Sequence, residues 1–118
     1  MRDEIKDLNI VIKYCDRIEN YIHKYGNDEN DFLENMEFQE GCAFCLIQIG
    51  EAAGRLPDKV RSLSKDTEWK EIVGLRNILA HRYGTVWLTG IWQTMTEDVP
   101  AFREVCVSML KILTNEQM

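Results

Sequence analysis

Apolar residues recur every three or four positions along most of this chain, and this spacing restricts the possible folds more than any other feature. It predicts an amphipathic helix over 3–25, a second over about 37–56 and a third over about 89–114. The one run suited to a strand, 85–88, is too short for a sheet and is expected to be a connection. We therefore expect an all-α fold, an up-and-down bundle of four to five helices.

Residues that break helices mark the ends of these segments. Pro57 is expected to end the second helix, with one short helical turn after it. The polar connector 64–67 can cap a further helix, which we expect to end near Gly84. Pro100 is expected to kink or restart the last helix near 97–99.

Size and composition are typical of one small globular domain, which we expect to span residues 1–118. The chain is 45% hydrophobic and 29% charged, a balance that argues against disorder. No basic segment followed by an apolar one opens the sequence, and no apolar run is long enough to cross a bilayer. We expect a cytoplasmic protein with no membrane partner.

Three glycines lie in the second helix, at positions 41, 50 and 54, and each weakens it by about 1 kcal/mol relative to alanine. Small residues on a helix face usually permit close approach by another helix. This helix is therefore expected to be central to the bundle or to a dimer contact.

The pair Cys42-x-x-Cys45 invites a redox or zinc interpretation. A zinc site needs four ligands, and no second Cys or His pair stands at a suitable spacing. A thioredoxin-type pair would open a helix after a strand, whereas this pair lies inside a helix. We expect buried free thiols here, and neither a metal nor a cofactor.

Four residues with chemical potential are close together near the end of the helix that follows 64–67: Arg76, Asn77, His81 and Tyr83. Arginine presents a planar fork of donors that matches phosphate oxygens, and histidine exchanges a proton near neutral pH. Together they are the minimum needed to cleave a phosphodiester without a metal. An Arg and a His in the last turn would equally complement the helix dipole, with no catalytic role.

The string Arg76-Asn77-x-x-x-His81-x-Tyr83 resembles the Arg-x4-His-x-Tyr signature of HepT-like ribonuclease toxins, a branch of the HEPN domain family. The segments 49–53, 69–74 and 91–100 are similar to flanking blocks of that family, in the same order. The resemblance covers almost the whole chain and implies a helical bundle of HEPN type.

The resemblance implies an endoribonuclease that needs no metal and acts as the toxin of a type VII-like toxin–antitoxin pair. RNA supplies its own nucleophile in the 2′-hydroxyl, so the expected product carries a 2′,3′-cyclic phosphate. His81 would be the general base or acid and Arg76 the phosphate clamp, with Asn77 in a supporting role. A net charge of −6 speaks against generic nucleic-acid binding, so we expect RNA at a local site and no DNA partner.

Helix geometry bears on how Arg76 and His81 meet. On an ideal α-helix Asn77 and His81 share a face, whereas Arg76 and His81 are about 140° apart. Either the helix unwinds before His81, or two chains set their motifs face to face. The family pattern favours the second, a homodimer with a composite cleft. Glu51 is either a solvated carboxylate or a salt-bridge partner that orients Arg76.

The resemblance to HepT-like toxins also implies a partner. In that family a minimal nucleotidyltransferase antitoxin silences the toxin by adenylylating the motif tyrosine, which is Tyr83 in this sequence. The added negative charge near His81 would obstruct RNA. The competing hypothesis is a catalytically inert helical binding module that partners such a nucleotidyltransferase. A third class, a protein that binds a small molecule in its bundle, has no positive sequence feature.

Overall fold

A computed structural model of the chain describes residues 2–80 and 84–116, and throughout this part the backbone is helical or irregular, with no strand. This confirms the all-α prediction. In chain order the elements are α1 (Arg2–Tyr25), α2 (Glu29–Leu33), α3 (Met36–Gly54), α4 (Asp58–Arg61), the 3-10 turn η1 (Ser62–Ser64), α5 (Trp69–Gly74), the 3-10 helix η2 (Leu75–Ala80), α6 (Gly84–Gln93), the π-helical turn η3 (Thr94–Asp98) and α7 (Val99–Glu116).

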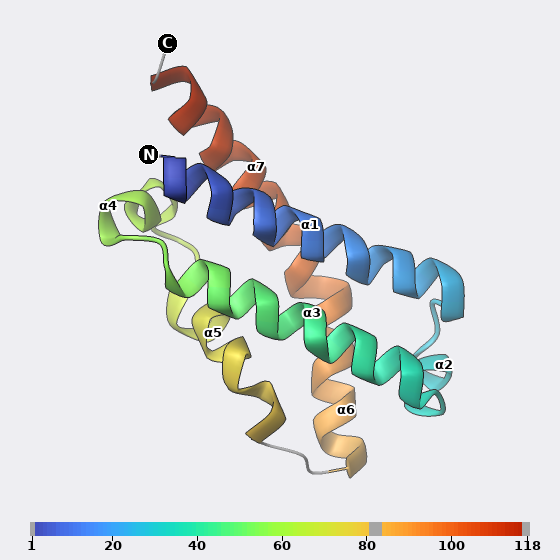
Figure 1. The fold of residues 1–118 in the computed structure, drawn as a ribbon. Coiled ribbons are helices and arrows are strands. Elements are labelled where there is room, and N and C mark those ends of the chain that lie inside the picture. Colours follow the sequence, from blue (N-terminus) through green and yellow to red (C-terminus); the bar gives the residue numbers. More distant parts are fainter. Residues whose placement is uncertain (1, 81–83, 117–118) are drawn as a thin grey trace.

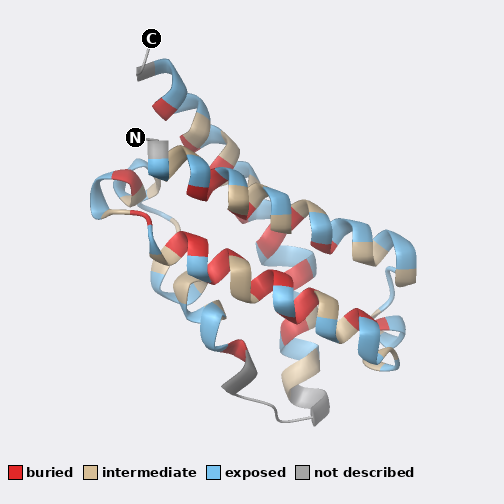
Figure 2. Cartoon of the chain, viewed as in Figure 1, coloured by how far each residue is buried: buried red, intermediate tan, exposed pale blue. Residues whose placement is uncertain are grey.

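The helix α3 is the centre of the bundle, as the small residues on its face predicted. It packs against α1 on one side and against α5 and η2 on the other, while α7 packs against α1 (Figure 1). The buried residues of α1, α3 and α7 face the interior that these helices share (Figure 2). None of the described helices contains a stretch long and apolar enough to span a membrane.

The helix α1 forms where its periodicity predicted it. Asp3 and Glu4 lie in its first turn, where carboxylates stabilise the positive end of the helix dipole. Gly26 ends the helix with a φ of 132°, a conformation that side chains disfavour, and its amide bonds the Ile22 carbonyl at 2.9 Å. The buried positions of α1 recur at the helical spacing: Leu8, Val11, Cys15 and Ile18.

The helix α3 begins at a side-chain cap, because the Asn35 Oδ1 atom accepts a hydrogen bond from the Phe38 amide at 3.1 Å. A Cβ atom added to Gly41 would lie 2.5 Å from the Tyr21 ring, so α1 packs directly on the α3 backbone there. The buried residues of α3 are Phe38, Cys42, Ala43, Cys45, Leu46, Ile49, Gly50, Ala52 and Ala53.

Aromatic rings join α2, α3 and α6 at one end of the bundle. The ring centroids of Phe32 and Phe38 are 5.0 Å apart, and both rings contact Trp92 at 5.5 and 6.1 Å. Such pairs contribute about 0.5–1.5 kcal/mol each beyond the area they bury. This cluster fixes the position of α6 relative to α3, which matters because α6 supports the motif segment.

The segment that carries the motif differs from its prediction. We expected one helix from 67 to about Gly84, but the α-helix ends at Gly74 and a 3-10 helix, Leu75–Ala80, continues from it. The predicted connection 85–88 is also wrong, because it forms the first turns of α6. Trp87 and Leu88 pack against the core, and this burial favours helix over an extended connection.

The last predicted helix is broken in the expected place. The chain passes from α6 through the π-helical turn η3 into α7, which starts one residue before Pro100 (Figure 1). Proline has no amide hydrogen to donate to the carbonyl four residues back, so a regular α-helical turn cannot close around it. The wider turn accommodates the missing hydrogen bond.

Candidate functional site

Three of the predicted site residues lie in the described part of the chain, and all three are exposed. Arg76 and Asn77 lie near the start of η2, and Glu51 lies in the last turns of α3. The predictions for His81 and Tyr83 fall on residues outside the described part. The described part of the candidate site is therefore Arg76 and the elements that hold it.

The backbone of Arg76 contacts the backbone of α3 directly at Gly50. A Cβ atom at Gly50 would lie 2.5 Å from the Arg76 amide nitrogen and 3.1 Å from the Ile72 carbonyl oxygen. Any larger residue would push the α5–η2 junction away from α3. Gly50 therefore permits a close backbone contact at the junction where α5 changes to the 3-10 helix η2.

The side chain of Arg76 lies along α3 as well. A Cβ atom at Gly54, one helical turn beyond Gly50, would stand 3.5 Å from one terminal guanidinium nitrogen, Nη1, of Arg76. The same atom would stand 3.5 Å from Val73, in α5. Two glycines one helical turn apart therefore lie next to the same arginine. Gly50 contacts its backbone, and Gly54 leaves space for its guanidinium.

A second support comes from α6. The indole N–H of Trp87 donates a hydrogen bond to the Ile78 carbonyl at 3.2 Å, and the Ile78 side chain is buried in the core. A 3-10 helix has poorer internal hydrogen bonds than an α-helix, so an external donor helps to hold it. The segment η2 is thus held by α3 on one side and by α6 on the other.

The start of α5 is tied to the end of α3 through Arg61. Its Nη2 atom donates to the Ala53 and Gly54 carbonyls at 3.1 and 3.2 Å, where a cation complements the helix C-terminus. The Trp69 indole donates to the Arg61 and Ser64 carbonyls at 3.1 and 3.0 Å. Both ends of the α5–η2 segment are therefore anchored to the bundle by tryptophan indoles.

The structure does not join Glu51 to Arg76, since no ion pair between them occurs among the described residues. The α-helical geometry that predicted Asn77 and His81 on one face does not hold at Asn77. The prediction assumed 3.6 residues per turn, whereas Asn77 lies in a segment with about 3.0, where residues three apart align.

The four cysteines are buried free thiols in α1, α3 and α7. Burial raises the pKa of Cys15 to about 12 and that of Cys45 to about 11, and it raises the pKa of Cys42 and Cys106 as well. These groups stay protonated at neutral pH, so they are poor nucleophiles and poor metal ligands. Among the described residues, no group of three or more His, Cys, Asp or Glu side chains is placed to hold a metal ion.

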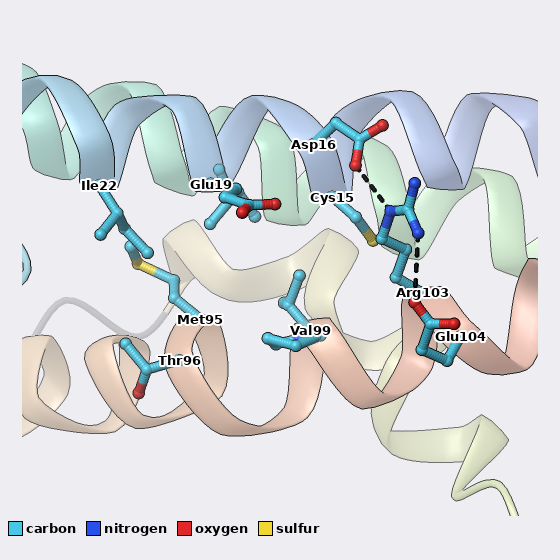
Figure 3. A pocket seen from close by; sticks show the side chains of 11 residues that line it. Cys15, Asp16, Glu19, Ile22, Met95, Thr96, Val99, Arg103 and Glu104 are labelled. Atoms are coloured by element: carbon cyan, nitrogen blue, oxygen red, sulfur yellow. Dashed lines mark hydrogen bonds and ion pairs between the residues drawn. The ribbon is translucent and has the colours of Figure 1, made fainter.

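A hollow of about 530 Å³ lies between α1 and the η3–α7 region, away from the motif (Figure 3). Arg103 crosses it, donating from Nε to Asp16 at 2.7 Å and from Nη1 to Glu104 at 3.2 Å. The bond to Asp16 raises the pKa of Arg103. This guanidinium is already occupied, whereas no described carboxylate pairs with that of Arg76.

The arrangement at η2 can therefore offer a fixed, exposed cation to a phosphate group. The sequence predicted this arginine, and the glycines of the second helix predicted a close contact there. It did not indicate that Arg76 makes the contact at Gly50, or that Trp87 supports the segment. Gly50-x-x-x-Gly54 was a usable signal, because such spacing marks a close backbone contact on a helix face. Trp87 gave no such signal, since its segment resembled a connection.

Comparison with known proteins places the chain in a family. The family model described as ribonuclease HepT-like matches residues 11–109. A candidate RNase of Methanocaldococcus jannaschii is 35% identical over 102 residues, covering 86% of this chain and 85% of its own. A second candidate RNase of that organism is 27% identical over 103 residues, covering 87% of each chain.

A third relative, from Thermococcus cleftensis, is named probable ribonuclease HepT. It is 32% identical over 73 residues, which cover 62% of this chain and 66% of the relative. No solved structure matches the chain at a significant level. The matched span includes both supports of Arg76 and the complete motif. The chain belongs to the ribonuclease HepT-like family.

Proposed function

We propose that this chain is an endoribonuclease toxin that cleaves RNA without a metal, with Arg76 and His81 as its catalytic residues. The observation that carries the proposal is the placement of Arg76. Its guanidinium is exposed and has no carboxylate partner among the described residues, while Gly50 holds its backbone. Its position five residues before His81 fits the family signature.

The reaction needs a base, a charge clamp and an acid. His81 removes the proton of the 2′-hydroxyl, whose oxygen then bonds to phosphorus. The Arg76 guanidinium stabilises the negative charge that develops on the phosphoryl oxygens. The bond from phosphorus to the 5′-oxygen breaks, and that oxygen takes up a proton. The products are a 2′,3′-cyclic phosphate and a free 5′-hydroxyl.

Two copies of the chain form the complete site in this proposal. The 3-10 helix that carries Arg76 ends at Ala80, before His81, so regular helix geometry does not set how the two residues of one copy meet. A two-fold pair of motifs supplies two histidines and two arginines to one cleft, as the family signature implies. In a two-fold dimer, His81 of the partner subunit protonates the leaving oxygen while His81 of the first copy acts as the base.

Cleavage of a 5′-labelled RNA by purified protein in EDTA tests the proposal. We expect a 2′,3′-cyclic phosphate end, and a loss of about 10²–10⁴-fold in rate for His81→Ala. Arg76→Ala should lose about 10²–10³-fold, with its circular dichroism unchanged because the side chain is exposed. Cleavage that depends on added divalent metal, or that persists in His81→Ala, would refute this function.

We further propose that a minimal nucleotidyltransferase antitoxin silences the chain by transferring AMP to the Tyr83 hydroxyl. The transfer forms a bond from the tyrosine oxygen to the α-phosphorus of ATP and releases pyrophosphate. The adduct brings negative charge two residues from His81 and repels RNA. Intact mass after co-expression with the antitoxin should rise by one or more AMP units in wild type and stay unchanged in Tyr83→Phe.

Growth separates the toxin from the inert alternative. Expression of the chain alone should arrest growth, and expression of His81→Ala should not. If wild type alone leaves growth and RNA intact while still accepting AMP, the chain is a helical binding module of the nucleotidyltransferase.

A further inference from the structure

The outward face of α1 carries only cationic and amide side chains along most of its length. Six exposed residues recur three or four positions apart and fall within an arc of about 80° on the helix. They are Lys6, Asn9, Lys13, Arg17, Asn20 and Lys24. We call this set the α1 crest. All six offer N–H donors, and such a row is unexpected in a chain of net charge −6.

The crest points away from the rest of the protein. Its centre lies roughly 180° around the helix from the buried face of α1, formed by Leu8, Val11, Cys15 and Ile18. No other described element covers it, since α3 and α7 pack on the two flanks of α1. The four cations are therefore open to solvent along about 27 Å of helix.

Carboxylates near the crest are largely neutralised by other partners. Asp7 and Asp16 lie on its two flanks, and each accepts a hydrogen bond from an arginine of another element, at 2.9 and 2.7 Å. Their partners, Arg55 and Arg103, lie in the α3–α4 connection and in α7. The remaining α1 carboxylate between Lys6 and Lys24, Glu19, lies roughly 120° from the centre of the crest.

The two central cations lie over one aromatic ring, that of Tyr14. The Lys13 Nζ atom and the Arg17 guanidinium carbon lie 5.4 and 5.6 Å from the centroid of the Tyr14 ring. That ring contacts Phe44 of α3 edge-on at 5.9 Å, and Phe44 is 50% exposed. Cations held over a ring lose less entropy on binding an anion, and an exposed phenyl face can stack a base.

We propose that the α1 crest binds the phosphate backbone of RNA, as a second contact separate from the motif. This inference rests on the proposed ribonuclease function. Regularly spaced cations with amide donors between them suit a chain of phosphates. An anionic membrane fits less well, because a helix that lies on a bilayer presents large apolar side chains, and the crest has none.

The position of the crest predicts that its effect depends on substrate length. The helix α3 lies between α1 and the motif segment η2 (Figure 1). An RNA of a few nucleotides can occupy the motif without reaching the crest, whereas a long RNA can contact both. The crest should then strengthen binding of long RNA and leave the cleavage of short RNA unchanged.

Binding of a 20-nucleotide, fully 2′-O-methylated RNA tests the crest without any cleavage, because this probe lacks the nucleophile. Fluorescence anisotropy is measured across salt concentrations for wild type and for Lys13→Gln/Arg17→Gln. The slope of log binding constant against log salt should fall in magnitude by about 1.4 in the double variant, and binding should weaken. The matched control Lys65→Gln/Lys111→Gln removes the same charge from exposed positions outside α1 and should leave the slope unchanged.

Cleavage and mass measurements keep the two proposals distinguishable. With active wild type, Lys13→Gln/Arg17→Gln should raise KM for a 20-nucleotide RNA and leave cleavage of a tetranucleotide unchanged. If wild type cleaves neither RNA, the ribonuclease proposal fails, while the methylated probe still decides the crest. An unchanged slope, an equal loss in the control, or no binding by wild type overturns the crest proposal. A changed assembly mass with unchanged RNA binding also overturns it and assigns the crest to a protein contact.

Discussion

The helix α3 and the adjoining α5–η2 segment are held in place in opposite ways. The first has a side-chain cap at Asn35 and nine buried residues, so its own sequence specifies it. The second has no side-chain cap and no buried residue in α5, and it narrows to a 3-10 helix that presents Arg76 to solvent. A regular helix thus supports an irregular segment that carries Arg76, the proposed phosphate clamp.

Loss of a buried side chain in α3 should have the largest effect on the free energy of unfolding. Phe38→Ala, at a fully buried position, should lower the free energy of unfolding by about 3–5 kcal/mol, because it leaves a cavity. Phe44→Ala on the same helix removes an exposed ring and should cost less than about 1 kcal/mol. Urea unfolding followed by circular dichroism measures both. Equal losses would mean that the burial of α3 does not set its stability.

A methyl group at the contact between the two regions should have the next largest effect. Gly50→Ala should destabilise the protein by about 1–3 kcal/mol, since its Cβ would meet the Arg76 amide nitrogen at 2.5 Å. It should also lower RNA cleavage, because the arginine shifts. Gly74→Ala is the matched control, as its Cβ would meet nothing within 4 Å. That variant should be as stable as wild type or gain up to about 1 kcal/mol. A neutral Gly50→Ala would show that α3 does not position η2.

The hydrogen bond from α6 tests how locally η2 is held. Trp87→Phe removes the donor to the Ile78 carbonyl and should weaken the segment by about 1 kcal/mol. Amide hydrogen exchange in 75–80 should accelerate about fivefold, while exchange in the middle of α3 should stay unchanged. Acceleration in both regions would mean that the motif segment and α3 open as one unit.

The smallest effect concerns the buried thiols, which lie in α1, α3 and α7 and are absent from α5 and η2. Burial raises the pKa of Cys45 to about 11 and that of Cys15 to about 12. Stability from these thiols is therefore complete below the unfolded pKa of about 9, and it falls as pH rises toward the folded values. The loss at pH 9 should be about 0.4 kcal/mol per thiol.

Urea unfolding from pH 7 to 10 measures this loss. In Cys45→Ala the free energy of unfolding should fall less steeply with pH, by the contribution of one thiol. A slope that is unaffected by this substitution would show that Cys45 ionises equally in the folded and unfolded chain.

The regular part of the fold could be predicted from sequence, because the apolar spacing and the helix-breaking residues of each long helix are local. The period of buried residues gave α1 and α3, and Pro100 gave the break before α7. The start of α6 was missed, since Gly84 looks like a helix end and the residues after it favour strands. Packing of Trp87 and Leu88 against the core decided the outcome, and such packing depends on contacts distant in sequence.

The candidate site could be located from the sequence, whereas its local geometry could not be predicted. Arg76 stood out because its residue type and spacing match a known signature. The 3-10 conformation of its segment could not be read from the sequence, since an α-helix and a 3-10 helix show almost the same apolar spacing over six residues. The change to 3-10 helix occurs where the backbone contacts Gly50, 26 positions earlier in the chain.

The π-helical turn η3 keeps α6 and α7 in phase with the core. Met95 lies inside this turn, and Ile91 and Val99 flank it at intervals of four, and all three are buried. A π-helical turn closes over one residue more than an α-helical turn. Deleting one residue of η3 would therefore let a plain α-helix form and would leave Phe102, Cys106 and Met109 facing the interior. Family members that are one residue shorter here are expected to have an unbroken helix with the same residues buried.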